Sequence, residues 1–125
     1  MHVLVIAPHR DDEMLGVGGT ILKRKSQGHR VAVCIVAAAE GCEMKPENQR
    51  LTEIVHKEML KAHAYCEIDK YIGLPFKSVL LESYPRMDLN QAILDVVREE
   101  MPEEVYIPFW EICREIINLL PKLLW

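Results

Sequence analysis

The stretch that decides the fold is HVLVIAPHRDDEMLGVGGTILKRKSQGHRVAVCIVAAAE, residues 2–40. It begins with a near-continuous apolar run over residues 2–8, which is typical of a central parallel strand covered on both faces. Residues 16–28 then predict a helix with Gly28 as its C-terminal cap, and residues 30–40 predict a second buried strand. A strand, a helix and a strand joined by short connections form a βαβ unit, whose crossover is right-handed almost without exception.

The rest of the chain continues the alternation of strands and helices. Composition and apolar spacing predict, in chain order, a helix at 49–65, a strand at 69–76, a helix from Asp88 as its N-cap to Pro102, a strand at 103–109 and helical spacing in the tail from 110 to 125. We therefore expect one domain over residues 1–125, in the α/β class, with three layers and a mainly parallel sheet. Because such sheets bind ligands at the carboxyl ends of their strands, we expect residues 7–13, residues 37–42, Phe76 and residues 108–115 to lie along one edge, and the acidic stretch therefore lies where chemistry is expected.

Composition excludes several classes of protein. The chain has 125 residues, 50% of them hydrophobic, which is enough for a folded core and too many for a disordered chain. Its net charge of −4 argues against nucleic acid as the main partner, because phosphate binding usually needs a basic face. No run approaches the roughly 20 apolar residues of a membrane span, and no signal-peptide pattern opens the chain, so we expect a cytoplasmic protein. The four scattered cysteines, without a C-x-x-C pair, are expected to be free thiols.

Five charged or metal-binding side chains follow the first strand at once, from His9 to Glu13. His9 and Asp12 are three positions apart, so their side chains can converge on one point in a turn that enters a helix. An imidazole nitrogen and a carboxylate oxygen are both good ligands for Zn²⁺. Asp11 would point elsewhere, free to act as a general base.

The residues by themselves leave other interpretations open. Acidic side chains at a helix start also cap the helix and interact favourably with its positive N-terminus. The glycine run GVGG, residues 16–19, can indicate the phosphate-binding loop of a nucleotide site, although it is not the G-x-G-x-x-G fingerprint. More simply, these glycines are expected to let the helix pack closely on the first strand.

The stretch APHRDDEMLGVGGTI, residues 7–21, resembles the signature of the LmbE / PIG-L family of zinc-dependent N-acetylglucosaminyl deacetylases. In that family an apolar strand is followed by A-H-P-D-D-E or P-H-P-D-D-E and then L-G-x-G-G-T, so Arg10 stands where proline is usual. The order of the later elements is similar too, and the family fold is Rossmann-like, in agreement with the elements expected above. The resemblance implies a hydrolase that removes an N-acetyl group from a small-molecule amino sugar or sugar conjugate, with Zn²⁺ as its cofactor.

The family's functional residues fall on several positions of this chain. The resemblance implies His9 and Asp12 as the first two zinc ligands and Asp11 as the general base for the attacking water. Glu13 matches the family's glutamate, and Glu40 matches the glutamate that follows the second strand. No residues that would bind another cofactor are implied.

The chain departs from the family where the third zinc ligand should lie. The segment WEICREI, residues 110–116, aligns with the family's D-I-H-x-D-H, and it places Ile116 at the ligand position and Cys113 at the other histidine. Cys113 and Glu115 are candidate substitute metal ligands, because thiolate and carboxylate both bind zinc. A competing interpretation is that the chain is a degenerate, catalytically inactive family member that acts as a binding or assembly protein.

The length of the chain and the predicted helix at 49–65 lead to further expectations. Family members are usually longer, so we expect a domain that is shortened and incomplete at its C-terminus and whose apolar tail favours a homo-oligomer. His56 and His63 are expected to be surface or partly buried helix residues rather than ligands, and His56 aligns roughly with a family arginine that contacts substrate. The helix at 49–65 is expected to carry its apolar residues mostly on one face: Leu51, Ile54, Val55, Met59, Leu60 and Ala62.

Overall fold

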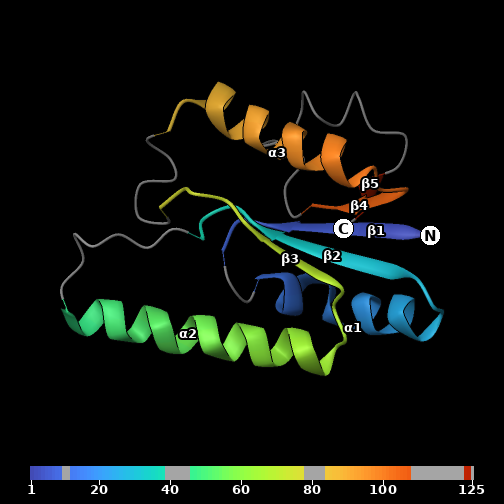
Figure 1. Cartoon of the computed structure of the whole chain (residues 1–125), viewed down its shortest axis with the longest axis horizontal. Coiled ribbons are helices and arrows are strands. Elements are labelled where there is room, and N and C mark those ends of the chain that lie inside the picture. Colours follow the sequence, from blue (N-terminus) through green and yellow to red (C-terminus); the bar gives the residue numbers. More distant parts are fainter. Residues whose placement is uncertain (10–11, 39–45, 78–83, 108–122, 125) are drawn as a thin grey trace.

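The structure, a computed structural model, describes residues 1–9, 12–38, 46–77, 84–107 and 123–124 (Figure 1). Strands and helices alternate along these ranges: β1 (His2–Ala7), α1 (Asp12–Ser26), β2 (Arg30–Ile35), α2 (Pro46–Tyr65), β3 (Lys70–Gly73), α3 (Arg86–Glu100), β4 (Glu104–Tyr106) and β5 (Leu123–Leu124). The order of elements predicted as far as the fourth strand is therefore confirmed.

Within the described residues, one five-stranded sheet has the order β3-β2-β1-β4-β5. Every neighbouring pair of strands is parallel, and β1 lies in the middle, paired with β2 over its full length and with β4 from Val3 to Val5. The chain moves from β1 to β2 and β3 on one side, and it returns to β4 on the other side of β1. The strand order thus reverses at the carboxyl end of β1, which is where open α/β sheets bind their ligands.

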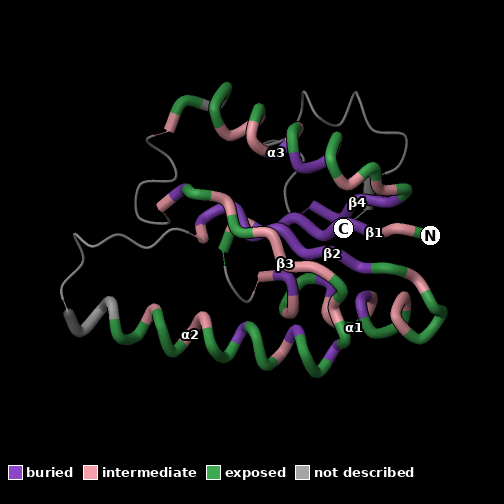
Figure 2. The backbone as a smooth tube through the Cα atoms, in the orientation of Figure 1, coloured by how far each residue is buried: buried purple, intermediate pink, exposed green. Residues whose placement is uncertain are grey.

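Helices cover both faces of the sheet, with α1 and α2 against one face and α3 against the other (Figure 1). Successive side chains of β1 point to opposite faces, so Leu4 packs in a core with Val97 of α3, whereas Val5 packs in a second core with Ile21 of α1. Figure 2 shows that burial is concentrated in the central strands, where each fully buried aliphatic side chain contributes about 1.5–3 kcal/mol. The expected three-layer, Rossmann-like α/β fold is confirmed.

Two predicted segments differ in the structure. β2 ends at Ile35 rather than at residue 40, because Ala37 forms an isolated antiparallel bridge with Pro75 instead of continuing the parallel ladder. Leu123, expected on a tail helix, lies in β5 beside β4. Pairing with an open sheet edge overrides helical spacing in so short an apolar segment. The tail residues 108–122 and 125 lie outside the described ranges.

The glycine run lies inside α1 at a kink. Val17 has non-helical dihedral angles (φ −134°, ψ 19°) between Gly16 and Gly18, so a short first turn precedes the main part of the helix. The expectation of close packing at these glycines is wrong for Gly18 and Gly19. A Cβ on Gly19 would meet nothing within 4 Å, and one on Gly18 would meet only Met14 of the same helix, at 3.8 Å. The glycines are associated with a change of direction, as is common at helix kinks.

α2 buries only part of the face that its apolar spacing predicts: Met59 is buried and Val55 and Ala62 are half-buried, whereas Leu51, Ile54 and Leu60 are exposed. The buried residues of its second half are Met59 and His63, with Cys66 directly after the helix. Figure 1 shows that the first half of α2 runs beyond the ends of β1 and β2, so the apolar residues there have no strand beneath them, and Leu51 and Ile54 are exposed. None of the described helices is both long enough and apolar enough to cross a membrane.

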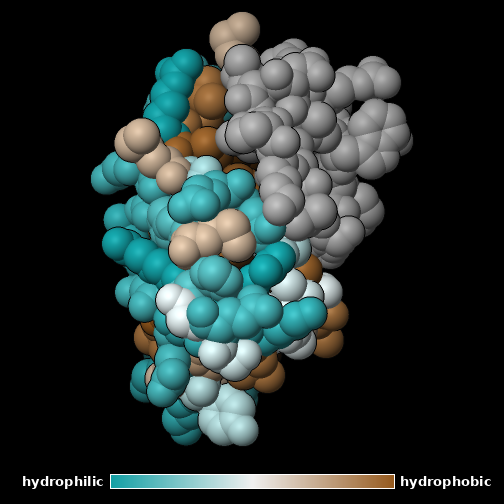
Figure 3. All heavy atoms as spheres, turned by 90° about the vertical axis from the view of Figure 1, so that its right-hand side faces the viewer, coloured by the Kyte–Doolittle hydropathy of each residue, from teal (hydrophilic) through white to brown (hydrophobic). Residues whose placement is uncertain are grey.

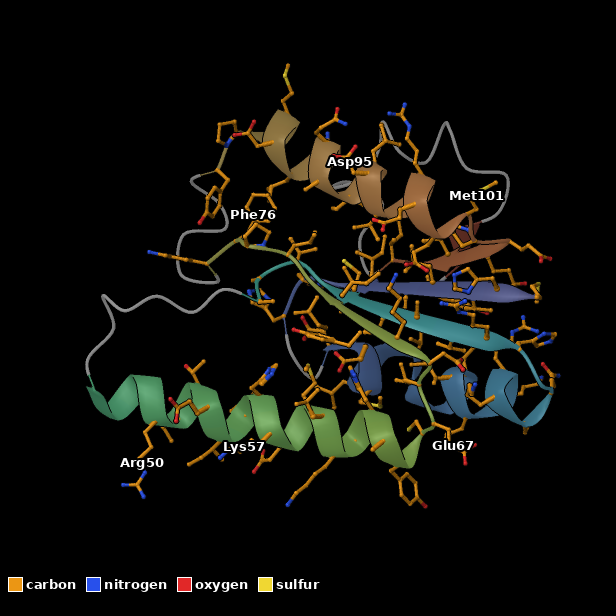
Figure 4. All side chains as sticks on the ribbon, viewed as in Figure 1. Arg50, Lys57, Glu67, Phe76, Asp95 and Met101 are labelled. Carbon is orange, nitrogen blue, oxygen red and sulfur yellow. The ribbon has the colours of Figure 1, made fainter. Side chains whose placement is uncertain are left out.

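Residues with left-handed dihedral angles follow each of the three helices in the described part of the chain. Gly28 (φ 80°) follows α1, and its N–H donates to the carbonyl of Lys25 at 3.0 Å, which confirms the predicted cap. Glu67 (φ 58°) follows α2 and Met101 (φ 48°) follows α3, both labelled in Figure 4. Asp88 is not the N-cap of α3, as was expected. The cap position is Pro85, and Asp88 lies in the first turn, where its negative charge interacts favourably with the positive end of the helix dipole.

Ion pairs join the helices to the amino-terminal edge of the sheet. Arg24 of α1 lies 3.0 Å from the buried Glu104 of β4. Glu100 at the end of α3 accepts hydrogen bonds from Lys70 of β3 and contacts His2 of β1 at 3.0 Å. Figure 3 faces this edge, and its surface outside the grey atoms is mainly hydrophilic. These contacts hold α1 and α3 against the amino-terminal edge of the sheet. The candidate site lies at the opposite, carboxyl edge.

Candidate functional site

The turn between β1 and α1 holds His9 and Asp12 against each other. The backbone N–H of Asp12 donates to the carbonyl of His9 at 3.3 Å, and Asp12 Oδ2 accepts from the backbone N–H of His9 at 3.1 Å. Asp12 and Glu13 both lie in the first turn of α1, as expected for acidic side chains that interact favourably with the positive N-terminus of a helix. The hydrogen bond from the His9 N–H to Asp12 Oδ2 closes the turn that leads into the helix. It does not compete with metal binding, since a carboxylate has two oxygens and about four acceptor sites.

The same two side chains meet the spacing that a metal would need. His9 Nδ1 lies 3.5 Å from Asp12 Oδ2, and the two side chains are 48% and 38% exposed. Two ligands at about 2.0–2.1 Å from a tetrahedral zinc ion lie ~3.3 Å apart, so the observed pair fits two adjacent corners of such a site. The convergence of His9 and Asp12 predicted from their spacing is confirmed, and a nitrogen–oxygen pair suits zinc.

The rest of the predicted site falls largely outside the described residues. Asp11, Glu40, Cys113 and Glu115 all lie there, so the general base and the substitute ligands stay predictions. Within the described ranges, no three His, Cys, Asp or Glu side chains gather closely enough to hold a metal ion. The described structure thus contains two candidate ligands, placed at the carboxyl end of β1.

Glu13 makes a buried contact that sequence reasoning missed. Its side chain is fully buried, and its Oε1 lies 2.8 Å from Nε2 of His63, which is 5% exposed. The ring of Tyr71 on β3 lies 6.0 Å from the ring of His63, centroid to centroid. The expectation that His63 is a surface or partly buried residue is wrong, because this histidine shares the buried face of α2 with Met59. Its spacing of four from Met59 is the signal in the sequence that could have indicated burial.

The described cysteines are buried thiols. Burial raises the pKa of Cys34 to about 12, with a smaller contribution from the nearby charge of Glu100, and burial also raises the pKa of Cys66. Neither thiol therefore forms a thiolate readily, and a thiolate is the form that binds zinc. Both are free, as expected, while Cys42 and Cys113 lie outside the described ranges.

Comparison with known families matches most of the chain. Residues 4–112 match the family described as "PIG-L: GlcNAc-PI de-N-acetylase". The matched region includes the turn with His9 and Asp12 and all elements from β1 to β4.

Several solved structures share the fold. A deacetylase triple mutant from the teicoplanin biosynthetic pathway superposes with a TM-score of 0.81 at 19% identity, over 100% of this chain and 63% of that one. N,N'-diacetylchitobiose deacetylase from Pyrococcus horikoshii has a TM-score of 0.71 at 25% identity, over 86% of this chain and 40% of that one. The 4-carboxy-2-hydroxymuconate hydratase from Pseudomonas putida KT2440 has a TM-score of 0.66 at 18% identity, over 91% of this chain and 54% of that one. The chain thus spans about two thirds or less of the length of these proteins.

Proposed function

Because the chain belongs to the PIG-L family, we propose that it is a zinc-dependent hydrolase that removes an N-acetyl group from an amino sugar or a sugar conjugate. The observation that carries the proposal is the 3.5 Å approach of His9 Nδ1 to Asp12 Oδ2 at the carboxyl end of β1. This is the position where the strand order reverses and where sheets of this type bind ligands. Two of the solved structures with this fold are named as deacetylases, which supports the reaction class.

The proposed roles follow from the chemistry of each side chain. His9 and Asp12 hold zinc, and the backbone bond from His9 to Asp12 Oδ2 keeps the carboxylate turned toward the imidazole. When bound, zinc supplies a Lewis acid for the amide carbonyl and for the attacking water. Asp11, one residue before α1, takes the proton from that water as general base. The leaving group is the sugar amine, and acetate is the second product.

The third ligand is a separate part of the proposal. Zinc in catalytic sites usually takes three protein ligands, and His9 and Asp12 supply two. Cys113 and Glu115 are the proposed sources of the third, since the aligned position holds Ile116. Replacing Cys113 with Ser and Glu115 with Gln, singly and together, distinguishes the two sources. The variant that weakens zinc binding identifies the ligand.

Zinc titration of the purified chain tests the metal site. We expect one zinc ion per chain, and we expect His9→Ala to weaken its binding at least tenfold, because one of the few ligands is lost. His29→Ala is the matched control, since His29 lies in the turn after α1, at the opposite edge of the sheet. Equal zinc affinity in wild type and His9→Ala would remove His9 from the site.

The inactive alternative makes a different set of predictions. A chain that only binds or assembles would hold zinc weakly, in the micromolar range or above, and would release no acetate from any N-acetylated sugar. Its zinc affinity would also be insensitive to the Cys113→Ser and Glu115→Gln changes. Ile116, at the position where the family has its third zinc ligand, is the observation that favours this alternative.

A further inference from the structure

We propose that Glu13 and His63 form a positioning pair that docks the first turn of α1 on α2 and so holds the His9–Asp12 turn in place. The inference rests on the proposed function in one respect, since the turn that the pair supports is the proposed zinc site. Neither residue is proposed to touch zinc or substrate.

The pair joins two helices at the site itself. Glu13 directly follows the candidate ligand Asp12, but its side chain points the other way, into the protein, where it is fully buried. Its Oε1 lies 2.8 Å from Nε2 of His63 in the last turn of α2. The two residues are 50 positions apart in the chain, so the contact fixes one element relative to another.

The kink makes the first turn of α1 depend on contacts of its own. Non-helical dihedral angles at Val17 separate residues 12–16 from the longer part of the helix, whose buried anchor is Ile21. Leu15 is 85% exposed, so it does not attach the turn to the core. The described contacts from this turn to α2 and its C-terminal cap include the Glu13–His63 hydrogen bond, a 4.0 Å contact between the sulfur atoms of Met14 and Cys66, and the packing of Met14 on the core that contains Met59.

Burial makes the contact sensitive to the loss of either partner. Among the described residues, Glu13 Oε2 and His63 Nδ1 have no hydrogen-bond partner, so the Oε1–Nε2 bond is the polar contact that the described structure gives each side chain. Removing one partner leaves the other buried and unpaired, which is more costly than removing both. A buried polar pair of this kind adds little net stability, but it selects one relative placement of the two helices over others. We infer that its consequence here is the placement of Asp12.

Hydrogen exchange of the amides in residues 12–16, measured on the full chain without metal, tests the pair directly. We expect Glu13→Ala and His63→Ala each to speed exchange in this turn about tenfold or more. Glu13→Gln and His63→Gln keep an acceptor and a donor respectively, so we expect both to stay close to wild type. Ile93→Ala of α3 is the control, because it creates a cavity in the core on the opposite face of the sheet from α1 and α2.

Zinc affinity supplies the second readout. We expect the two alanine variants to bind zinc about tenfold more weakly than wild type, in the range seen when supporting residues of metal sites are lost. Ile93→Ala should leave the affinity unchanged even where it lowers the overall stability.

The two proposals fail in different ways. Unchanged exchange at residues 12–16 in Glu13→Ala and His63→Ala would overturn the positioning pair, whatever the chain does with zinc. The same would follow if Ile93→Ala had as large an effect on this turn as His63→Ala. A wild-type chain that binds no zinc would instead overturn the proposed function, while faster exchange in the two alanine variants would still support the docking contact.

Discussion

Asp12 has two tasks at the start of α1, and they can be separated by mutation. Its Oδ2 accepts the backbone N–H of His9, and the carboxylate charge is what a zinc ion needs from an oxygen ligand. An asparagine in its place keeps an oxygen that accepts the N–H but carries no charge. An alanine keeps neither property.

We predict that Asp12→Asn changes the free energy of unfolding by less than about 0.5 kcal/mol but weakens zinc binding at least tenfold. Asp12→Ala should weaken zinc binding similarly and also cost about 1 kcal/mol of stability, because the hydrogen bond that closes the turn before α1 is lost. Chemical denaturation and zinc titration of the three proteins check this. Wild-type zinc affinity in Asp12→Asn would show that Asp12 closes the turn before α1 without binding zinc.

At the scale of single elements, two helices end on residues that favour other conformations. Glu67 and Met101 adopt left-handed dihedral angles in which a side chain is strained, and glycine is not. We predict that Glu67→Gly and Met101→Gly each raise the free energy of unfolding by about 0.5–1 kcal/mol. Lys57→Gly, in the exposed interior of α2, is the control and should lower stability by about 1 kcal/mol. A loss of stability in both cap variants would contradict the assigned helix ends.

Glu100 at the end of α3 makes the stability of the fold depend on pH in the acidic range. The hydrogen bond from Lys70 lowers the pKa of Glu100 below its ordinary value, burial opposes the shift, and His2 adds to it. The pKa of Glu100 is lower in the folded state than in the unfolded state. Its contribution to the free energy of unfolding is therefore fully present above the unfolded-state pKa, and it is lost as the pH falls through the folded-state pKa.

We therefore predict that Glu100→Gln lowers stability at pH 7 by about 1.5–3 kcal/mol, as expected for hydrogen bonds to a charged group. It should also make the loss of stability below pH 5 less steep. Unfolding midpoints measured from pH 7 to pH 3 check both statements. The exposed carboxylate of Glu103 is the control, and an equally steep acid dependence in Glu100→Gln would contradict the assignment.

The elements that the sequence predicted well are those whose signals are local. The apolar run of β1 and the left-handed Gly28 needed no knowledge of distant residues, and the three-residue spacing of His9 and Asp12 predicted their convergence. The predictions that failed depended on tertiary contacts. β5 forms because β4 offers a free edge, and His63 is buried because Glu13 of another helix faces it. A single sequence contains no direct record of such pairs.

At the scale of the whole molecule, the fold alone does not determine the reaction. The same three-layer arrangement occurs in proteins named as deacetylases and in one named as a hydratase. Function in such folds resides in the side chains at the carboxyl edge of the sheet. The case for a deacetylase therefore depends on the family and on the His9–Asp12 pair, not on the architecture.

Self-association is a further prediction at this scale. The apolar tail and the exposed apolar side chains of α2, such as Leu51 and Ile54, favour contact with another apolar surface. We expect size-exclusion chromatography at micromolar concentration to show a species larger than the monomer. Elution at the monomer mass over a tenfold dilution series would contradict the prediction.

Release of acetate from N-acetylglucosamine conjugates is the measurement that tests the central claim most directly. It should be made on one protein preparation as purified, after removal of metal with a chelator, and after zinc is restored. The account predicts that acetate release stops on chelation, returns with one equivalent of zinc, and stays absent in His9→Ala under all three conditions. Acetate release that persists after chelation, or none from a chain that holds stoichiometric zinc, would contradict the account.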